Sequence, residues 1–336
     1  TDEYGGSMEN RARLLRELIE ETKEAVGDRC AVAVRYSVGG DDGESDTLTN
    51  ERRDCLEMLA EYPDLWDINI NNYEREMGVS RFFESGSLEE YMAFVKSVTT
   101  KPVVTVGRFT SPDAMASQVR RGIVDFIGAA RPSIADPFLP KKIFEGRLDD
   151  IRECIGCNIC YTGDGLGTPI RCTQNPTMGE EYRRQWHPEI IARKDSDSRV
   201  LIVGAGPAGL EAARMLGQRG YSVMLAEATR TLGGRVTREA ALPGLSEWIR
   251  VRDYRVQQIE KINQVEIFRE SELNSEDVIS TGVDHVVIAT GASWRKDGLG
   301  RSHPFAYGAS ELQGNILTPD DIMNGQIPRG HIVVYD

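Results

Sequence analysis

The chain has 336 residues, enough for about two domains, and its 40% hydrophobic and 28% charged residues are typical of a globular protein. The net charge of −13 argues against nucleic acid or an anionic membrane as a partner, and no apolar run is long enough to span a bilayer. Reduced cysteines and no recognisable targeting segment predict a cytoplasmic protein.

The first 150 residues alternate predicted helices with predicted strands. Short loops join them, which indicates parallel βα units, and four such units make half of an eight-stranded barrel. We therefore predict the C-terminal half of a (β/α)8 TIM barrel over residues 1–150, with a small doubly wound sheet as the alternative. Helices are expected near Met8–Val26, Asn50–Glu61, Ser87–Val98, Asp113–Arg121 and Pro140–Glu145, and strands at Cys30–Tyr36, Leu65–Ile70, Pro102–Arg108 and Ile123–Ala129.

Arginines follow several of these predicted strands. Arg35, Gly107–Arg108 and Ala130–Arg131 stand where strands end, and barrels of this kind place their sites at the C-terminal ends of strands. Glycine lets backbone N–H groups approach a ligand, and arginine binds phosphate oxygens with two parallel hydrogen bonds. The pattern predicts a phosphate site here, with surface salt bridges as the alternative.

Four of the six cysteines lie within nineteen residues. Cys154, Cys157 and Cys160 are spaced by two residues, and Cys172 follows after a predicted loop rich in glycine and proline (residues 163–169). Structural zinc sites usually pair two separate CxxC turns, so this spacing favours an iron–sulfur cluster, most simply [4Fe–4S]. The alternatives are disulfides or unconnected buried cysteines. Cys30 and Cys55 are expected in the core.

A dinucleotide-binding pattern begins near residue 196. Gly204, Gly206 and Gly209 form a GxGxxG motif between a predicted strand and a predicted helix, and Glu227 follows about twenty residues later. The glycines admit a pyrophosphate to the helix N-terminus, and the acid holds a ribose. Gly234–Arg235 extends this site. The expected elements are strands Arg199–Val203, Tyr221–Ala226 and Val286–Gly291 and helix Leu210–Arg219.

Three parts are therefore predicted: the half barrel (1–150), a cluster segment and linker (151–195), and a truncated Rossmann-like βαβ domain (196–336). The chain begins without methionine and ends just after a strand-like run, His331–Tyr335, so we interpret it as a fragment of a longer protein. A domain for NAD(P)H, if one is used, is expected to begin near His331.

Several longer motifs resemble one known family. Tyr4–Arg13 and Gly128–Pro132 resemble motifs of the old yellow enzyme-type flavin barrel, and Ala130–Pro140, the cysteine run and Gly179–Pro188 resemble the trimethylamine, dimethylamine and histamine dehydrogenases. The resemblance covers nearly the whole chain. The cysteine spacing also fits 2,4-dienoyl-CoA reductases of the same architecture, but Gly179–Arg184 favours the amine branch.

The resemblance implies three cofactors. FMN would contact Arg35, Gly107, Arg108, Ala130 and Arg131, the four cysteines would hold [4Fe–4S], and the second domain would bind ADP or FAD through Gly204, Gly206, Gly209, Glu227, Gly234 and Arg235. A positive charge at Arg35 would stabilise the reduced, anionic flavin. The implied reaction oxidises an amine carbon to an imine that water hydrolyses, with electrons passing through the cluster to an electron-transferring flavoprotein. The implied assembly is a homodimer.

Three residues are candidates for the substrate pocket by the same resemblance. Tyr73 stands at a position of the aromatic bowl that holds an amine cation in the trimethylamine enzyme. Asp164 stands where that enzyme has an aromatic residue, and a carboxylate there would pair with a second polar group of the substrate; the alternative is an aspartate in a common Gly-Asp-Gly turn. Glu76 falls near the family's active-site aspartate. The alternative activity is an NAD(P)H-dependent 2,4-dienoyl-CoA or enoate reductase.

Overall fold

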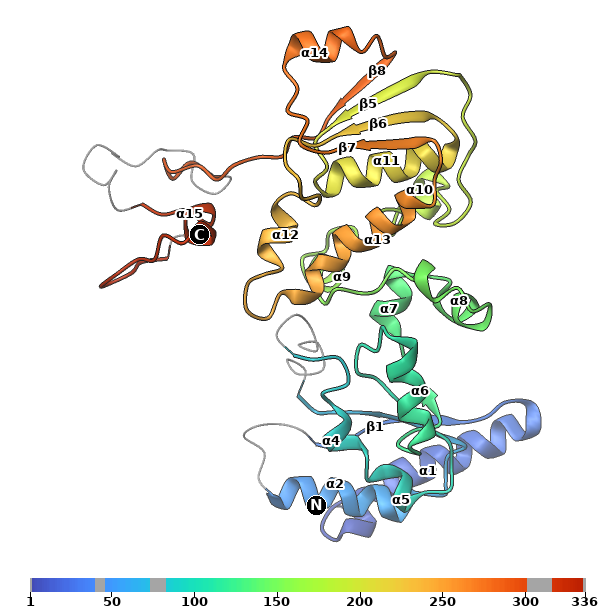
Figure 1. Ribbon diagram of the computed structural model, residues 1–336. Coiled ribbons are helices and arrows are strands. Elements are labelled where there is room, and N and C mark those ends of the chain that lie inside the picture. Colours follow the sequence, from blue (N-terminus) through green and yellow to red (C-terminus); the bar gives the residue numbers. More distant parts are fainter. Residues whose placement is uncertain (1, 40–45, 73–82, 301–315, 335–336) are drawn as a thin grey trace. The chain divides into compact units, whose positions relative to one another are not determined.

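The computed structural model describes residues 2–39, 46–72, 83–300 and 316–334, and Figure 1 shows their elements. The chain forms two compact units, Thr1–Ile190 and Ile191–Asp336, which are described separately below. In the described ranges, none of the helices combines the length and the apolar composition that crossing a membrane requires.

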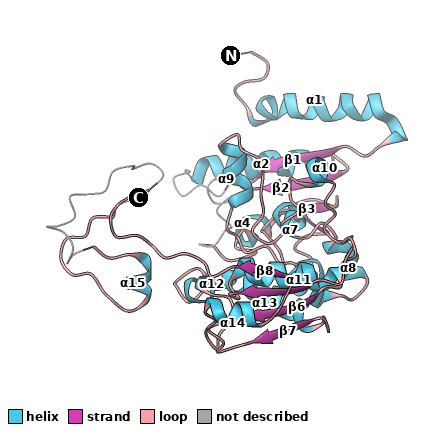
Figure 2. Ribbon diagram, turned by 90° about the horizontal axis from the view of Figure 1, so that it is seen from above, coloured by secondary structure: helices cyan, strands magenta, loops and turns pink. Residues whose placement is uncertain are grey.

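The first unit is built on a four-stranded parallel sheet. Its strands are β1 (Ala33–Ser37), β2 (Leu65–Asn69), β3 (Val103–Thr105) and β4 (Phe126–Ile127), and they lie side by side in this order. Sequential order with parallel pairing requires a crossover after each strand, which is the βα pattern predicted from the sequence. Figure 2 shows the strands in magenta with helices around them.

An aspartate just before a strand fixes the register of three strand pairs. Asp64, which precedes β2, accepts a hydrogen bond from Val32 N at 2.8 Å and donates its own N–H to Val32 O. Asp125, which precedes β4, makes the same pair of bonds with Val103. Each carboxylate satisfies an N–H that would otherwise lack a partner at the start of the neighbouring strand. The second unit repeats the arrangement at Asp284 and Arg199.

Helices and a buried apolar cluster complete the first unit. The cluster centres on Trp66, Leu56, Ile68 and Met92, and the Trp66 indole N–H donates to Ala60 O at 2.9 Å. The helices are α1 (Met8–Val26), α2 (Asp46–Leu59), α4 (Glu89–Met92), α5 (Val95–Val98), α6 (Pro112–Arg120), α7 (Ala130–Ala135), α8 (Leu139–Phe144), α9 (Ile159–Gly165) and α10 (Glu181–Arg184), with 3-10 turns at Gly27–Arg29 and Leu148–Asp150.

Three local predictions were wrong in the first unit. The helix predicted over Ser87–Val98 is two separate turns, α4 and α5. The predicted loop at 163–169 begins inside α9. Cys30, expected in the core, is exposed because it follows the turn that ends α1 and precedes β1.

The second unit has its own four-stranded parallel sheet. The strands are β5 (Arg199–Val203), β6 (Ser222–Ala226), β7 (Val265–Phe268) and β8 (His285–Ile288), and they lie in the order β7-β6-β5-β8. The first strand in the chain is therefore central and the direction of winding reverses beside it, as in a Rossmann-type fold. This confirms the predicted nucleotide-binding fold.

The helices of the second unit are α11 (Pro207–Arg219), α12 (Arg235–Glu239), α13 (Arg250–Glu260), α14 (Ser275–Ser280) and α15 (Pro319–Met323), with a 3-10 turn at Ser246–Ile249. In Figure 1, α11 and α13 lie on one side of the sheet. Their buried side chains Leu210 and Ile259 join Ile202 and Leu225 in the core. The strand-like run at His331–Tyr335 does not form a strand in the part that the structure describes, residues 331–334.

Candidate functional site

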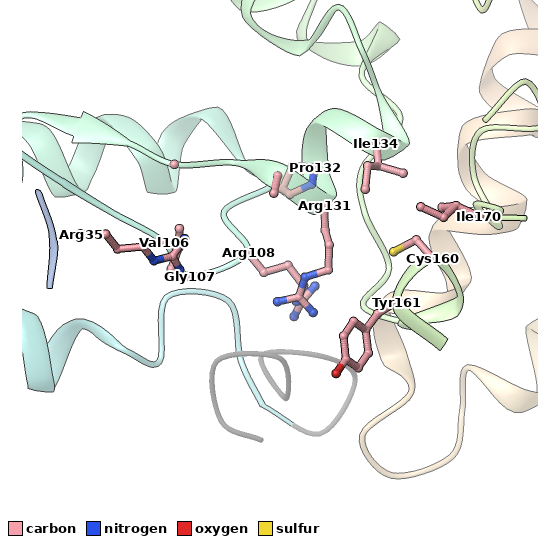
Figure 3. Close-up of a pocket in the computed structure, with 12 residues that line it drawn as sticks. Arg35, Val106, Gly107, Arg108, Arg131, Pro132, Ile134, Cys160, Tyr161 and Ile170 are labelled. Carbon is pink, nitrogen blue, oxygen red and sulfur yellow. The ribbon is translucent and has the colours of Figure 1, made fainter. Parts of the chain in front are cut away.

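A cavity of about 420 Å³ lies in the first unit at the carboxyl ends of its strands. The three charged residues among its lining are all arginines, Arg35, Arg108 and Arg131. Figure 3 shows the guanidinium ends of Arg108 and Arg131 directed toward the same part of the cavity. Among the residues that the structure describes, the lining holds three cations and no carboxylate, in a chain of net charge −13, and such a lining suits an anion. The rest of the lining is Val106, Gly107, Gly128, Ala130, Pro132, Ile134, Cys160, Tyr161 and Ile170.

Arg108 is held from both sides. The residue is 4% exposed, its backbone has φ 51°, and its Nη2 donates to Phe83 O at 3.3 Å. Ser85 Oγ donates to Arg108 O at 2.9 Å, which ties the two loops together. A left-handed backbone at a residue other than glycine costs free energy and persists only where the surroundings enforce it. The loop therefore holds this guanidinium in place before a ligand binds.

Arg35 lines the cavity from the first strand of the sheet. It lies on β1 directly opposite Asp67 of β2, and its Nη1 is 3.9 Å from the Asp67 carboxylate. Its side chain is 56% exposed. An ion pair at this distance and exposure is weak.

Arg131 connects this cavity to the cysteine segment. It lies on α7, and its Nη1 donates to Asn158 Oδ1 at 2.7 Å. Asn158 lies between Cys157 and Cys160 and has φ 56°. Cys160 and Tyr161 line the same cavity as the arginines, so the cysteine segment forms one wall of it. No role was predicted from the sequence for Asn158 or Tyr161; the signal for Asn158 was an asparagine inside a CxxC turn.

The four cysteines are free thiols in partly buried surroundings. Burial raises the pKa of the Cys154 thiol to about 11, against the opposing charges of Arg108 and Arg131. Burial also raises the pKa values of Cys160 and Cys172. Gly156 N donates to Cys154 Sγ at 3.5 Å. Buried thiols that receive amide hydrogen bonds suit thiolates bound to a cationic metal centre.

The donor set therefore fits an iron–sulfur cluster in its chemistry. In the ranges that the structure describes, no three histidine, cysteine, aspartate or glutamate side chains converge closely enough to hold a metal ion. The assignment of Cys154, Cys157, Cys160 and Cys172 as cluster ligands stays a prediction. It is supported by four free thiols, partial burial and amide donors around them.

A buried ionic network joins the segments that flank the cysteines. Lys142 and Asp136, 1% and 0% exposed, pair at 2.7 Å. Asp136 also accepts a bond from Arg152 N, and Lys142 and Arg152 both contact the Glu189 carboxylate, at 3.0 and 2.9 Å. The segments just before and just after the cysteines are thereby joined. Asn175, three residues after Cys172, accepts from the Arg152 guanidinium at 3.4 Å.

The second unit places the predicted dinucleotide motif between β5 and α11. Gly204 has φ 101°, and a side chain on Gly209 would place Cβ 1.8 Å from Gly204 O. Gly206 has no heavy atom within 4 Å of where its Cβ would be. Two of the glycines thus permit the tight turn and the close packing of helix on strand, and the third leaves open space at the N-terminus of α11, where a pyrophosphate fits.

The remaining nucleotide-site residues lie around this loop. Glu227 directly follows β6, and its carboxylate accepts from Ala205 N at 2.9 Å and from Thr229 N at 3.0 Å. A Cβ on Gly234 would be 3.2 Å from Gly206 Cα, so Gly234 lies against the GxGxxG loop. Arg235 donates to Ala292 O and pairs with Asp320 at 3.0 Å. The structure thus brings all six predicted residues of this site into one region of the second unit.

The structure describes little of the three predicted substrate-pocket residues. Tyr73 and Glu76 lie outside the described residues. The backbone of Asp164 belongs to α9 rather than to the Gly-Asp-Gly turn considered as an alternative, and its side chain lies outside the described part. α9 also carries Cys160 and Tyr161, two residues that line the cavity.

Comparison with known proteins agrees with this architecture. Residues 1–150 match the NADH:flavin oxidoreductase / NADH oxidase family, and residues 198–318 match the pyridine nucleotide-disulphide oxidoreductase family. Dimethylamine dehydrogenase of Hyphomicrobium sp. (strain x) is 44% identical over 355 aligned positions, which cover 100% of this chain and 48% of the relative. The chain belongs to the family of dimethylamine and histamine dehydrogenases.

Two solved structures of this family extend the match. Histamine dehydrogenase from Rhizobium sp. 4-9 is 55% identical with a TM-score of 0.91. The match covers 98% of this chain and 48% of the histamine dehydrogenase chain. The 6-hydroxypseudooxynicotine amine oxidase from Pseudomonas geniculata N1 is 53% identical with a TM-score of 0.92, covering 98% and 49%. The chain spans about half the length of these relatives. The predicted flavin-barrel and nucleotide-binding fold is confirmed.

Proposed function

We propose that the full-length protein is a cytoplasmic amine dehydrogenase that oxidises a small amine of the trimethylamine, dimethylamine or histamine type. FMN, when bound, supplies the two-electron chemistry at the amine carbon. Cys154, Cys157, Cys160 and Cys172 would hold a [4Fe–4S] cluster, which would supply one-electron transfer toward an electron-transferring flavoprotein. The protein works as a homodimer and binds no nucleic acid.

One observation carries this proposal: the arginine-lined cavity also has Cys160 in its wall. Arg108 and Arg131 present guanidinium groups that suit the doubly charged phosphate of FMN. Arg35 brings a third positive charge to the cavity and favours an anionic reduced flavin. Electron transfer needs the flavin and the cluster close together, and a shared wall provides that proximity.

The second unit is proposed to bind ADP or FAD. Gly204, Gly206 and Gly209 leave room for a pyrophosphate at the N-terminus of α11, and Glu227 stands at the end of β6, where the adenosine ribose is held in such folds. Both nucleotides carry the same adenosine and pyrophosphate, so these residues serve either one. Mass spectrometry of the nucleotide released from the full-length protein distinguishes ADP from FAD.

The decisive experiment uses the full-length protein under anaerobic conditions. The protein is mixed separately with trimethylamine, dimethylamine, histamine and NADPH, and the flavin absorbance is followed. We expect an amine to bleach the flavin and NADPH not to do so. Bleaching by NADPH alone would overturn the proposal and support a dienoyl-CoA or enoate reductase, in which electrons run the opposite way.

A further inference from the structure

The turn between Cys157 and Cys160 lies beside a cationic side chain. Arg131, on α7, donates from Nη1 to Asn158 Oδ1 at 2.7 Å, and Asn158 stands between the two cysteines. Arg131 and Cys160 also line the same cavity, as Figure 3 shows. Neighbouring Cα atoms are about 3.8 Å apart along a chain, so a guanidinium bonded to Asn158 lies on the order of 10 Å from the sulfur atoms of this turn.

The backbone around Asn158 fixes the place of this charge. Asn158 has φ 56°, a conformation that asparagine tolerates better than most residues. Its carbonyl accepts from Thr162 N at 2.9 Å and from Thr162 Oγ1 at 3.1 Å, which starts the helix that carries Cys160. The amide that binds Arg131 is therefore held in a defined position relative to Cys160, and the guanidinium is held with it.

We propose that Arg131, positioned by Asn158, makes the iron–sulfur cluster of the cysteine segment easier to reduce. This rests on the proposed function, in which the cluster accepts electrons from the flavin. Each electron that enters adds one negative charge at the cluster, and a positive charge nearby stabilises this reduced state more than the oxidised one. For one unit charge at about 10 Å and an effective dielectric constant of about 20, the equilibrium shifts about tenfold toward the reduced cluster.

The test is a reductive titration of the full-length protein with dithionite and redox mediators, followed by the EPR signal of the reduced cluster. Arg131→Gln keeps a donor for Asn158 but loses the charge. At the wild-type midpoint potential, the ratio of reduced to oxidised cluster should therefore fall about tenfold in this variant. Arg131→Lys keeps the charge, and its ratio should stay within about twofold of wild type.

Asn158→Asp tests the same charge without altering one of the cavity arginines. Aspartate accepts the left-handed backbone and pairs with Arg131, which cancels the positive charge at the turn, so the ratio should again fall about tenfold. Gln185 is the matched control, because it also has φ 56° but lies exposed at the end of α10. Gln185→Asp adds the same negative charge in solvent, where salt screens it, and should titrate as wild type.

The inference is overturned if the cluster midpoint of Asn158→Asp is unchanged, or if Gln185→Asp lowers it as much. Arg131 is also proposed to contact FMN, so the flavin content of each variant is measured, and Asn158→Asp decides the question if Arg131→Gln loses flavin. If the wild-type protein contains iron and is reduced by an amine, such a result overturns this inference alone. A wild-type protein without iron would overturn the proposed function with it.

Discussion

The two units build their proposed phosphate sites in different ways. The first unit uses side-chain charge: Arg35, Arg108 and Arg131 are brought to one cavity at the ends of strands. The second unit uses backbone: open space beside Gly206 at the start of α11, with no arginine in the loop between β5 and the helix. Charge acts at a distance and tolerates small displacements, whereas a backbone site depends on how closely the chain can pack.

Substitutions should therefore have different effects in the two units. An arginine in the first cavity can be replaced by another side chain that fits the same space, at the expense of binding. Gly209 cannot be replaced without moving the backbone, because a Cβ at this position would lie 1.8 Å from Gly204 O, which leaves no room for a methyl group. We therefore expect changes in the first site to affect ligand binding, and changes at this contact to affect folding.

The largest effect is expected for Gly209→Ala. Separating α11 from the turn after β5 should lower the free energy of unfolding of the second unit by about 3 kcal/mol or more. Thermal or denaturant unfolding of the full-length protein measures this. Ala213→Gly, on the same helix, is a control for helix composition and should cost less, about 1 to 2 kcal/mol from lost packing and helix propensity. Unfolding of Gly209→Ala at the wild-type midpoint would contradict the packing argument.

A smaller effect, and one confined to binding, is expected for Arg108→Lys. Lysine keeps the charge but lacks the planar fork, so FMN affinity should fall about 30-fold to 100-fold, equivalent to roughly 2 to 3 kcal/mol. Flavin bound per chain and titration of flavin-depleted protein measure it. Arg121→Lys, whose bidentate partner is the surface residue Glu89, is the matched control and should leave FMN binding unchanged. Equal FMN affinity in both variants would remove Arg108 from the phosphate site.

Gly206→Ala should separate ligand binding from folding within the second unit. Its Cβ meets no atom within 4 Å, so the unfolding free energy should stay within about 0.5 kcal/mol of wild type. The methyl group would occupy the open space at the start of α11 and should weaken ADP binding about tenfold. Calorimetric titration with ADP, after removal of any nucleotide carried through purification, tests this. A variant that binds ADP normally would place the pyrophosphate elsewhere.

The smallest effect concerns the ionic network of the first unit. Burial opposes ionisation of Glu189, but the hydrogen bond and charge of Lys142 and the charge of Arg152 outweigh it and hold its pKa below the ordinary 4.5. A lowered pKa stabilises the fold above that value, and the stabilisation is lost as pH falls through the lower, folded-state pKa. Because the carboxylate is about one-third exposed, Glu189→Gln should cost only about 1 kcal/mol at pH 7.

Denaturant unfolding as a function of pH measures this difference. The gap between wild type and Glu189→Gln should be constant at neutral pH and close as the pH falls below 4.5. Glu145→Gln, which removes a surface partner of Arg147, should track wild type throughout. A gap that persists under acidic conditions would show that the change acts through packing and not through charge.

Much of the fold could be predicted because its signals are local. β5, Arg199–Val203, agrees with its predicted bounds, and α1 does too, since Ser7 caps its start and Gly27 its end. Short helices in glycine-rich segments were harder to predict. Gly163 and Gly165 suggested a loop, yet α9 includes both.

Site residues could likewise be predicted where a local motif marks them, and not where their partners are distant in the sequence. Arg108, Arg131 and Cys160 could be named from motifs, and the structure places them around one cavity. Asn158 could not be assigned a role, because its partner Arg131 is 27 residues away in the sequence and only the folded chain brings them together. The buried pair Lys142–Asp136 was missed because a lysine in a short helix is normally on the surface.

The aspartates that precede β2, β4 and β8 bear on how this protein can be recombined. Asp64, Asp125 and Asp284 each bind both backbone groups of a residue at the start of the neighbouring strand, across separations of 32, 22 and 85 residues. A chimera whose crossover point falls between such an aspartate and its strand would lose the contact that aligns the pair. Crossovers placed one residue earlier, before the aspartate, keep each exchanged βα segment together with its own alignment device.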